Sequence, residues 1–527
     1  MSAPTNIGNR ERRRSVLDVG GPNSINQFAS SFKRAQTYMT IDVDNEAFDL
    51  SPRSSVVDDA LLATPAPQYD SVLTGRVSPA PLRGIDSIQS FHFPGAPTDV
   101  ERDGFVHRRA SMASVKSTFR EITGDSTAPQ TIFNSINVMV GIGILSLPLG
   151  LKYCGWVYGV ILLTLSALTT RYTAVLIGRI LAKHDGIYSY GELAKFCYGT
   201  KGQYVVSLIF CFDLVGACVS LILLFADSLT ILVPSVSSTS FKIIVCAISF
   251  VVSFLPFSIL SFLSVIGIIC TSSIVVLVTV CGLFFGGISA PGSLLAPEVT
   301  NTWPLDYTNI LLGLGIFMAP WGGHAVFPEL FRDMRHPHKY THCVNVTFLF
   351  SYGVDIWLAV VGFLMFGVNV AEEITQNLML TTKYPAWVPT VIAVLMGLLP
   401  LSKAPLMTKP ILTAAEQVLG IDKQILALKN QAELKRALFK VFIQQLLLKV
   451  LIFAMFYTIS ITVTSFGKMM AFLGSAICFT ICITLPLMFY RHIFYAELSQ
   501  IERLGLAAGI TLSTVCCVFG SYAAICF

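Results

Sequence analysis

The sequence predicts an all-α membrane protein whose helices follow a long polar N-terminal segment. Hydrophobic residues make up 54% of the 527-residue chain and charged residues only 13%, which is too apolar for an ordinary water-soluble core. Several apolar runs reach the length of about 20 residues that crosses the hydrocarbon of a bilayer. Two of these runs are interrupted in the middle by glycine and proline. Together these observations predict a bundle of spanning helices, two of which are broken at membrane depth.

The chain divides at about residue 127. Residues 1–127 are rich in Ser, Pro, Asp, Asn and Arg and contain no apolar run that could span a membrane or build a core, which is the composition of a disordered segment. No signal-peptide pattern follows Met1, so we expect a cytosolic tail. Four short patterns resemble kinase sites and make kinases candidate partners of the tail: Arg12-Arg13-Arg14-Ser15, Arg108-Arg109-Ala110-Ser111, Ser51-Pro52 and Ser78-Pro79.

Residues 128–527 are predicted to form a domain of eleven spanning helices. Lys and Arg gather in the loops after the second, sixth, eighth and tenth helices, whereas residues 290–306 contain neither. By the positive-inside rule the N-terminus is cytosolic and, after eleven spans, Phe527 lies on the opposite side. The expected ranges are 131–150, 154–181, 204–233, 241–257, 262–288, 308–328, 343–367, 386–411, 445–464, 468–490 and 504–526.

Between the eighth and ninth helices, residues 413–445 are too charged to span the membrane. Their apolar residues recur at helical spacing with Lys and Glu between them. We therefore expect an amphipathic helix here, either on the membrane surface or packed on other cytosolic loops.

The two interrupted apolar runs hold the candidate binding site. Residues 131–150 contain Gly141-Ile142-Gly143 and Pro148, and residues 310–328 contain Pro320-Trp321-Gly322-Gly323. Irregular backbone at membrane depth is tolerated only where it is buried in protein or lines a cavity. Breaks at matching places in two halves of a chain indicate the binding site of a secondary transporter. Helices one to five and six to ten are therefore predicted to form two inverted halves, with the eleventh appended. The alternative is that the glycines only allow close helix packing.

Unwound backbone at these breaks suits a zwitterion. Amides at the N-terminus of a half-helix favour an anion such as an amino-acid carboxylate, and carbonyls at the end of the preceding half-helix accept from an ammonium. A neutral zwitterion is then recognised without any charged side chain, with Trp321 as a wall. The candidate substrate-binding residues are Asn137, Gly141, Ile142, Gly143, Ile144, Ser146, Trp321, Gly322, Gly323 and His324.

Three motifs resemble the amino acid/auxin permease family. Residues 134–148 followed by Gly155-Trp156 are similar to its first helix, and residues 189–193 to the segment after its second. Residues 322–328 resemble the sixth-helix motif Ser-Gly-His-Ala-Val-Phe-Pro of its vacuolar amino acid transporter group, with Gly322 in place of the usual serine. The resemblance covers residues 128–527 and implies a LeuT-type fold with two inverted five-helix repeats and an eleventh helix. It also implies proton-coupled amino-acid transport.

Four ionisable residues within the predicted spans are candidates for proton coupling: Asp213, His324, Asp355 and Lys403. Such residues cost at least ~2.5 kcal/mol at the centre of a spanning helix and are functional candidates by default. For Asp355 the alternative is a hydrogen bond to a neighbouring helix, and for His324 it is a cap on the broken helix. Lys403 lies on the helix that helps to hold sodium in sodium-coupled relatives of the fold, so its ammonium is a candidate replacement for that ion. Snorkelling and a salt bridge with Asp355 are the alternatives for Lys403.

The sequence thus predicts a proton-coupled secondary active transporter of neutral amino acids, with amino acid/proton antiport across the vacuolar membrane and a lumenal C-terminus. Plasma-membrane proton symport, and an amino-acid sensor that signals through its tail, are the alternatives. No phosphate-binding loop, zinc-ligand spacing or CxxC motif is present, so ATP drive, enzyme activity, and a metal or cofactor site are not expected. Nucleic acid is not an expected partner because the basic residues lie in short loops.

Overall fold

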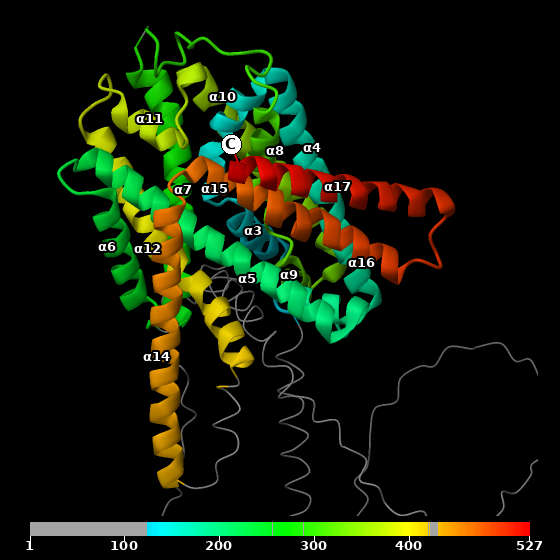
Figure 1. Ribbon diagram of the computed structural model, residues 1–527. Helices are drawn as coiled ribbons and strands as arrows, with labels where there is room; N and C mark the ends of the chain where they lie inside the picture. The colour runs from blue at the N-terminus through cyan, green and yellow to red at the C-terminus, as the bar shows by residue number, and fades with distance from the viewer. Residues whose placement is uncertain (1–123, 256, 288, 420, 422–430, 527) are drawn as a thin grey trace, which may run out of the picture. The chain divides into compact units, whose positions relative to one another are not determined.

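The computed structural model describes residues 124–526 apart from 256, 288, 420 and 422–430 (Figure 1). These residues are mostly helical, and the extended backbone among them forms one isolated bridge between Ser126 and Met334. The predictions made for residues 1–123, the kinase sites included, lie outside the described residues. The α-helices are α3 (Ala128–Met139), α4 (Leu147–Lys183), α5 (Tyr190–Leu232), α6 (Ser238–Val252), α7 (Phe257–Val280), α8 (Asn309–Met318), α9 (Phe327–Arg332), α10 (Tyr340–Phe366), α11 (Ile374–Leu380), α12 (Trp387–Val418), α14 (Gln431–Thr462), α15 (Phe466–Phe472), α16 (Leu485–Ile493) and α17 (Gln500–Cys526).

Short segments of tighter or wider helix join these elements. Two 3₁₀ helices lie inside the broken runs, η3 (Ile142–Ser146) and η5 (Ala319–Trp321), and two more, η6 (Pro337–Lys339) and η7 (Gly367–Asn369), flank α10. Two π-helices continue apolar spans, η4 (Cys281–Phe285) after α7 and η8 (Leu473–Thr484) between α15 and α16.

All eleven predicted spans are helical over most of their length. Among the described residues, eight helices are long and apolar enough to cross a membrane, and two shorter apolar helices are Ser238–Val252 and Asn309–Trp321. One of the eight, Ile142–Lys183, holds parts of two predicted spans because α4 bends at Gly155. The φ of Gly155 is 68°, in the left-handed region that favours glycine. Five of the predicted helices therefore precede the second break, five begin with it and α17 is the last, and the structure confirms the predicted all-α class.

Both predicted helix breaks are present, and proline starts a new half-helix at each. The first run ends α3 at Met139, passes through η3 and continues as α4, whose first turn contains Pro148. The second ends α8 at Met318, passes through η5 and resumes as α9, whose first turn contains Pro328. Proline is tolerated in the first turn because the amide it lacks would have no intrahelical partner there.

The two breaks lie against each other. A Cβ added to Gly143 would lie 3.4 Å from the backbone of Ala319 and Pro320, and one added to Gly323 would lie 3.3 Å from the Met139 side chain. In Figure 1, α3 accordingly lies beside α9, and α8 lies beside α4. Segments about 180 residues apart in the sequence thus meet at their irregular backbone, as expected for a shared site.

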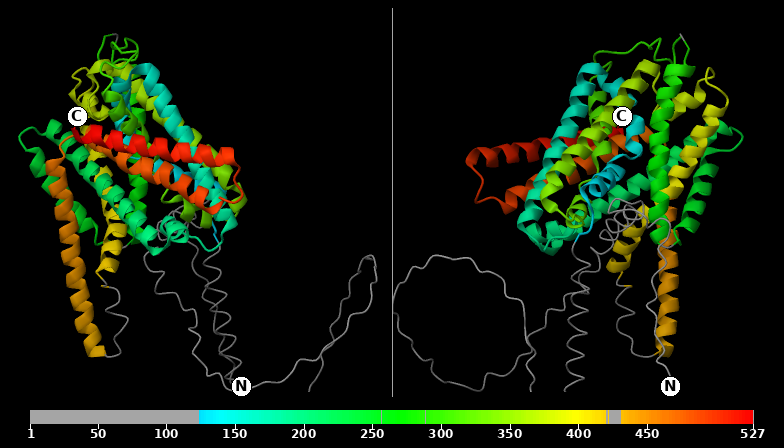
Figure 2. Two further views of the ribbon diagram at one scale, coloured as in Figure 1. Left: turned by 45° about the vertical axis from the view of Figure 1, so that its right-hand side comes forward. Right: turned by 180° about the vertical axis from the view of Figure 1, so that it is seen from behind.

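α15, η8 and α17 pack on α8, the first half of the second broken helix. α8 crosses η8 where a Cβ on Gly474 would lie only 1.8 Å from the Gly315 carbonyl oxygen, so the two backbones touch. α16 and α17 run side by side in both views of Figure 2, and α17 also packs along η8. Small residues allow this close approach of helices in a membrane.

The amphipathic helix expected at residues 413–445 is not a separate element, which corrects that prediction. α12 continues to Val418, and α14 begins at Gln431 and runs into the ninth span without interruption, extending away from its neighbours in Figures 1 and 2. Residues 422–430 of the expected helix lie outside the described residues. The physical reason is that no Gly or Pro stands between Gln431 and Thr462 to end a helix.

Candidate functional site

A cavity of about 230 Å³ lies where the two breaks meet. Its wall is formed by α3 and the start of η3, by η5 and Gly322, and by faces of α5, α7, α12 and η8. At ~30 Å³ for each molecule of liquid water, this volume equals about seven or eight waters. It lies below the roughly 300–1,000 Å³ of pockets for drug-sized ligands, so it suits a small solute.

Five of the predicted substrate-binding residues line this cavity: Asn137, Gly141, Ile142, Gly143 and Gly322. Gly322 stands where the resembling family has serine, and a Cβ there would lie 3.3 Å from the Cys478 sulfur. Cys478 comes from η8 and also lines the cavity. The thiol therefore occupies space beside the position that the missing serine side chain would take.

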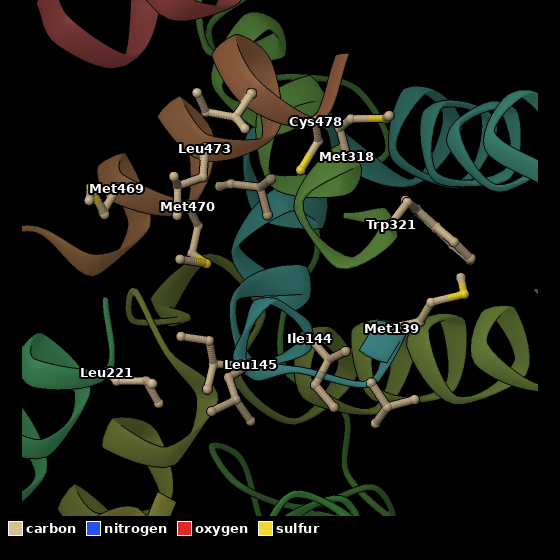
Figure 3. Close-up of a cluster of buried hydrophobic side chains, with 14 of the residues drawn as sticks. Met139, Ile144, Leu145, Leu221, Met318, Trp321, Met469, Met470, Leu473 and Cys478 are labelled. Atoms are coloured by element: carbon tan, nitrogen blue, oxygen red, sulfur yellow. The ribbon is translucent and has the colours of Figure 1, made fainter. Parts of the chain in front are cut away.

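Four of the other predicted binding residues lie behind the breaks. Ile144 and Ser146 are fully buried, and the Ser146 hydroxyl donates to the Gly143 carbonyl at 2.9 Å, which fastens η3. Trp321 is fully buried and stacks on Phe348 with ring centroids 5.5 Å apart; Figure 3 shows it on the other side of the turn from Met470 and Leu473. Gly323 packs on α3. None of these four lines the cavity.

His324 also lies outside the cavity and contacts α4. It is fully buried, and its Nε2 atom lies 3.0 Å from both the Thr173 hydroxyl and the Thr170 carbonyl oxygen. Thr173 in turn donates to the Cys482 carbonyl at 2.6 Å. The imidazole thus ties the second break to α4 and, through Thr173, to η8. Its Nδ1 atom is buried without a hydrogen-bond partner among the described residues.

The proton-coupling candidates divide into two groups. Asp213 from α5 and Lys403 from α12 line the cavity. Asp355 is buried within α10 and does not line it, and its Oδ2 atom has no hydrogen-bond partner among the described residues. No ion pair within 4.0 Å joins Lys403 to Asp355 in the part of the chain that the structure describes.

Sequence reasoning missed most of the apolar wall. The wall includes regularly spaced residues of two helices, Phe210, Leu214, Ala217 and Leu221 on α5, and Leu406, Met407 and Pro410 on α12. Each set follows the spacing of three, four and seven residues that marks one face of a helix. This helical spacing could have identified the wall from the sequence. If Asp213 and Lys403 face a cavity, the residues one and two turns away on the same helix face are expected to face it too.

The cavity extends toward one end of the bundle and not toward the other. It reaches Val326 and Leu330 at the second break and Pro410 on α12, whereas no described residue of α11 or of the loop 286–308 lines it. Towards α11, the Lys152 ammonium donates to the Val370 carbonyl at 2.9 Å. Glu372 accepts from the Ser465 hydroxyl at 2.7 Å and from the Gly467 amide at 3.1 Å. These bonds hold the segment before α11 to α4 and α15, and so close that end.

Glu373, next to this closure, has a raised pKa. It is fully buried at the start of α11 and accepts from the Thr375 hydroxyl at 3.0 Å and the Gln376 amide at 2.9 Å. Burial raises the pKa of Glu373 well above its usual range, and the nearby Asp227 carboxylate raises it further. The folded chain therefore favours the protonated form, and this contribution to stability is lost as the pH rises through the folded-state pKa.

Glu373→Gln is expected to raise the midpoint of thermal unfolding at neutral and mildly alkaline pH. The amide keeps the shape of the side chain and stays neutral, so the cost of a buried charge disappears. Below about pH 4.3, the ordinary pKa of a glutamate, wild type and variant should unfold at the same temperature. Thermal unfolding of the purified chain in detergent across this pH range measures the difference. A variant that is less stable than wild type at neutral pH would contradict the prediction.

Metal binding has no candidate centre in the described part of the chain. No group of three or more His, Cys, Asp or Glu side chains there is arranged to hold a metal ion. The thirteen cysteines are all free thiols.

Comparison with known proteins gives a family match over the whole helical domain. A family model described as "Transmembrane amino acid transporter protein" matches residues 124–526. Amino acid transporter AVT1E of Arabidopsis thaliana is 27% identical over 420 residues, which cover 76% of this chain and 73% of the relative. Amino acid transporter AVT1D of the same organism is 28% identical over 414 residues, or 75% of this chain and 69% of the relative. A putative sodium-coupled neutral amino acid transporter 11 of Bos taurus is 25% identical over 258 residues, 47% of this chain and 54% of the relative.

Two solved structures are also similar to this chain at 12% identity. One is Mhp1, a nucleobase-cation-symport-1 family transporter in a closed conformation with bromovinylhydantoin bound, with a TM-score of 0.44 over 76% of this chain and 90% of that one. The other is a Na⁺-coupled sialic acid symporter in a substrate-bound outward-open state, with a TM-score of 0.44 over 75% and 89%.

Proposed function

Because this chain belongs to the transmembrane amino acid transporter family, we propose that it is a proton-coupled secondary active transporter that exchanges neutral amino acids for protons across the vacuolar membrane. The observation that carries the proposal is the cavity between the two breaks. It brings irregular backbone at Gly141–Gly143 and Gly322 together with two titratable side chains, Asp213 and Lys403. Substrate and proton can therefore bind within the same small cavity.

The proposed substrate class follows from the cavity wall. Apart from its two charged groups and a few polar side chains, the wall is apolar, with Phe210, Leu214 and Met407 among its larger members. A neutral amino acid presents opposite charges at its α-carbon and an uncharged side chain, which matches this distribution. The Bos taurus relative is likewise named for neutral amino acids.

The proposed transport cycle alternates access between the two ends of the two inverted five-helix repeats. In the arrangement described, the end at α11 is closed by the Lys152 and Glu372 bonds, and the cavity extends toward α9. The positive-inside rule puts the α9 end in the cytosol and the α11 end in the lumen. Opening the lumenal end requires breaking those few bonds, while the contacts of the breaks stay near the centre.

Two alternative functions differ from this proposal, one in the membrane where the protein acts and the other in whether it transports its ligand. Plasma-membrane proton symport uses the same cavity with proton and amino acid moving together, and the vacuolar assignment rests on the motif at residues 322–328. Localisation of the tagged full-length chain separates these two. An amino-acid sensor would bind its ligand in the cavity and produce no flux, so sealed liposomes separate it from a transporter.

Amino-acid flux in proteoliposomes is expected to follow an imposed pH gradient and to ignore replacement of sodium by potassium or choline. One pH unit is worth about 1.4 kcal/mol, so an exchange of one proton per amino acid accumulates substrate by about tenfold per unit. Asp355→Asn should shift the pH dependence of that flux if this buried carboxylate also carries the proton, and should leave it unchanged if Asp355 is structural.

Flux that requires sodium in the wild type would refute proton coupling. Saturable binding with no flux at any gradient would favour the sensor. A pH gradient that drives the amino acid in the same direction as the proton would favour symport over exchange.

A further inference from the structure

Two opposite charges face the cavity from neighbouring helices. Asp213 lies on α5 and Lys403 on α12, and these helices pack along each other. Lys403 is only 7% exposed. Its stem is closely packed, because a Cβ added to Gly267 of α7 would lie 2.9 Å from the Lys403 Cε atom. The packing of its stem therefore holds the ammonium beside the cavity.

Neither charge has a partner in the described protein. The ion pairs among the described residues lie elsewhere, at Lys183–Glu497, Arg332–Asp185 and Arg335–Asp125, and neither Asp213 nor Lys403 makes a hydrogen bond to a described residue. A charge that faces an otherwise apolar cavity without a partner in the protein is unfavourable, so a ligand of opposite charge is stabilised beside it. The apolar residues that share the cavity wall with Asp213 and Lys403 offer them no such partner.

We propose that Asp213 and Lys403 hold the two charged ends of the transported amino acid, Asp213 accepting from its ammonium and Lys403 donating to its carboxylate. This inference rests on the proposed transport function and identifies the side chains that recognise an amino acid as the substrate. It replaces the sequence-based expectation that the zwitterion is recognised without charged side chains. The irregular backbone at Gly141–Gly143 and Gly322 then orients the α-carbon between the two charges.

Pairing with Asp213 and Lys403 requires the substrate to carry both an ammonium and a carboxylate. Both α-substituents must be free and ionised, because a ligand that lacks one of them leaves Asp213 or Lys403 without a partner. A site built to pair a polar group rejects an analogue without that group far more strongly than a site that only fits its shape. Amino-acid amides and 2-hydroxy acids nearly match the parent in size, so they test charge separately from shape.

The experiment measures equilibrium binding to the purified full-length chain. The probes are L-alanine and L-leucine, their amides, which lack the carboxylate, and the corresponding 2-hydroxy acids, which lack the ammonium. The wild type is expected to bind each analogue about 10- to 100-fold more weakly than its parent, the range for losing a hydrogen bond to a charged group. Asp213→Asn should reduce the penalty for the hydroxy acids to within about twofold and keep the penalty for the amides. Lys403→Met should do the reverse.

Each penalty is the ratio of the analogue's dissociation constant to that of its parent, measured in the same variant. A variant that is merely less stable therefore changes neither ratio. Asp213→Glu keeps the carboxylate and should keep the penalty for the hydroxy acids. The matched controls are Asp227→Asn on α5 and Lys409→Gln on α12, which do not line the cavity and should leave both ratios unchanged. Penalties that survive in both Asp213→Asn and Lys403→Met would overturn the pairing and leave the transport function standing. A wild type that binds neither parent amino acid would overturn both.

Discussion

Replacing Gly143 by valine is expected to weaken amino-acid binding strongly in a chain that still folds and inserts. Gly143 lines the cavity, and a Cβ there would already touch the backbone of Ala319 and Pro320 at 3.4 Å. The two further methyl groups of valine have no space between the breaks, so they either separate the breaks or fill the cavity. Overpacking of this kind costs about 1–3 kcal/mol, or roughly 5- to 150-fold in affinity. Binding and flux in proteoliposomes measure the loss.

A graded control separates this effect from loss of fold. Gly143→Ala adds only a Cβ at ordinary contact distances and should keep most of the binding. Gly141→Ala lies at the same break, and the atom nearest to its added Cβ would be the Met139 carbonyl oxygen at 4.0 Å, so it should also be tolerated. Unchanged affinity in Gly143→Val would show that the breaks are packing devices and that the substrate binds elsewhere. Gly323→Val, which packs on α3 outside the cavity, should weaken binding through displacement of the second break.

Replacing Gly474 by alanine is expected to destabilise the whole bundle. The added Cβ would lie 1.8 Å from the Gly315 carbonyl oxygen and 2.9 Å from the Ala319 amide nitrogen, and backbone atoms cannot move aside as a flexible side chain can. α8 and η8 must therefore separate, at a cost of about 3 kcal/mol or more. Fluorescence-detected size exclusion and thermal unfolding of the variant in detergent should show a lower yield of folded protein and a lower unfolding temperature.

Gly505→Ala is the matched control for that prediction. Gly505 is also a helical glycine in the last part of the chain, but an added Cβ there meets nothing within 4 Å. This variant should unfold at the wild-type temperature or slightly above it, because alanine has the higher helix propensity. Equal stability of Gly474→Ala and Gly505→Ala would mean that the contact of α8 with η8 does not support the fold.

The helices and their two breaks could be predicted from local sequence because lipid enforces them. A spanning segment must satisfy its backbone internally, so length and apolarity are sufficient to find it. The glycines and prolines at residues 141–148 and 320–328 mark the breaks for the same reason. The sequence analysis did not predict that the ninth span begins as far back as Gln431 in α14. The charges in that segment indicated that it does not span the membrane, but they do not show where a helix begins.

The candidate site was predicted only in part. Gly141, Gly143 and Gly322 were found because irregular backbone is visible in the sequence, and they line the cavity. Trp321 and His324 belong to the second break, yet their side chains pack on Phe348 and Thr173 behind it. Which way a side chain points in a nonhelical turn depends on backbone angles that residue types do not specify.

The sequence by itself determined that this chain is a multi-span helical membrane protein, where its helices break, and which ionisable residues lie within them. These properties depend on the contrast between lipid and water, which acts on each segment separately. Only the tertiary structure decided that Asp213 and Lys403 share one cavity while Asp355 and His324 lie outside it. That choice depends on the rotation of α5, α10 and α12 about their own axes, and rotation is fixed by the packing of neighbouring helices, which no single segment contains.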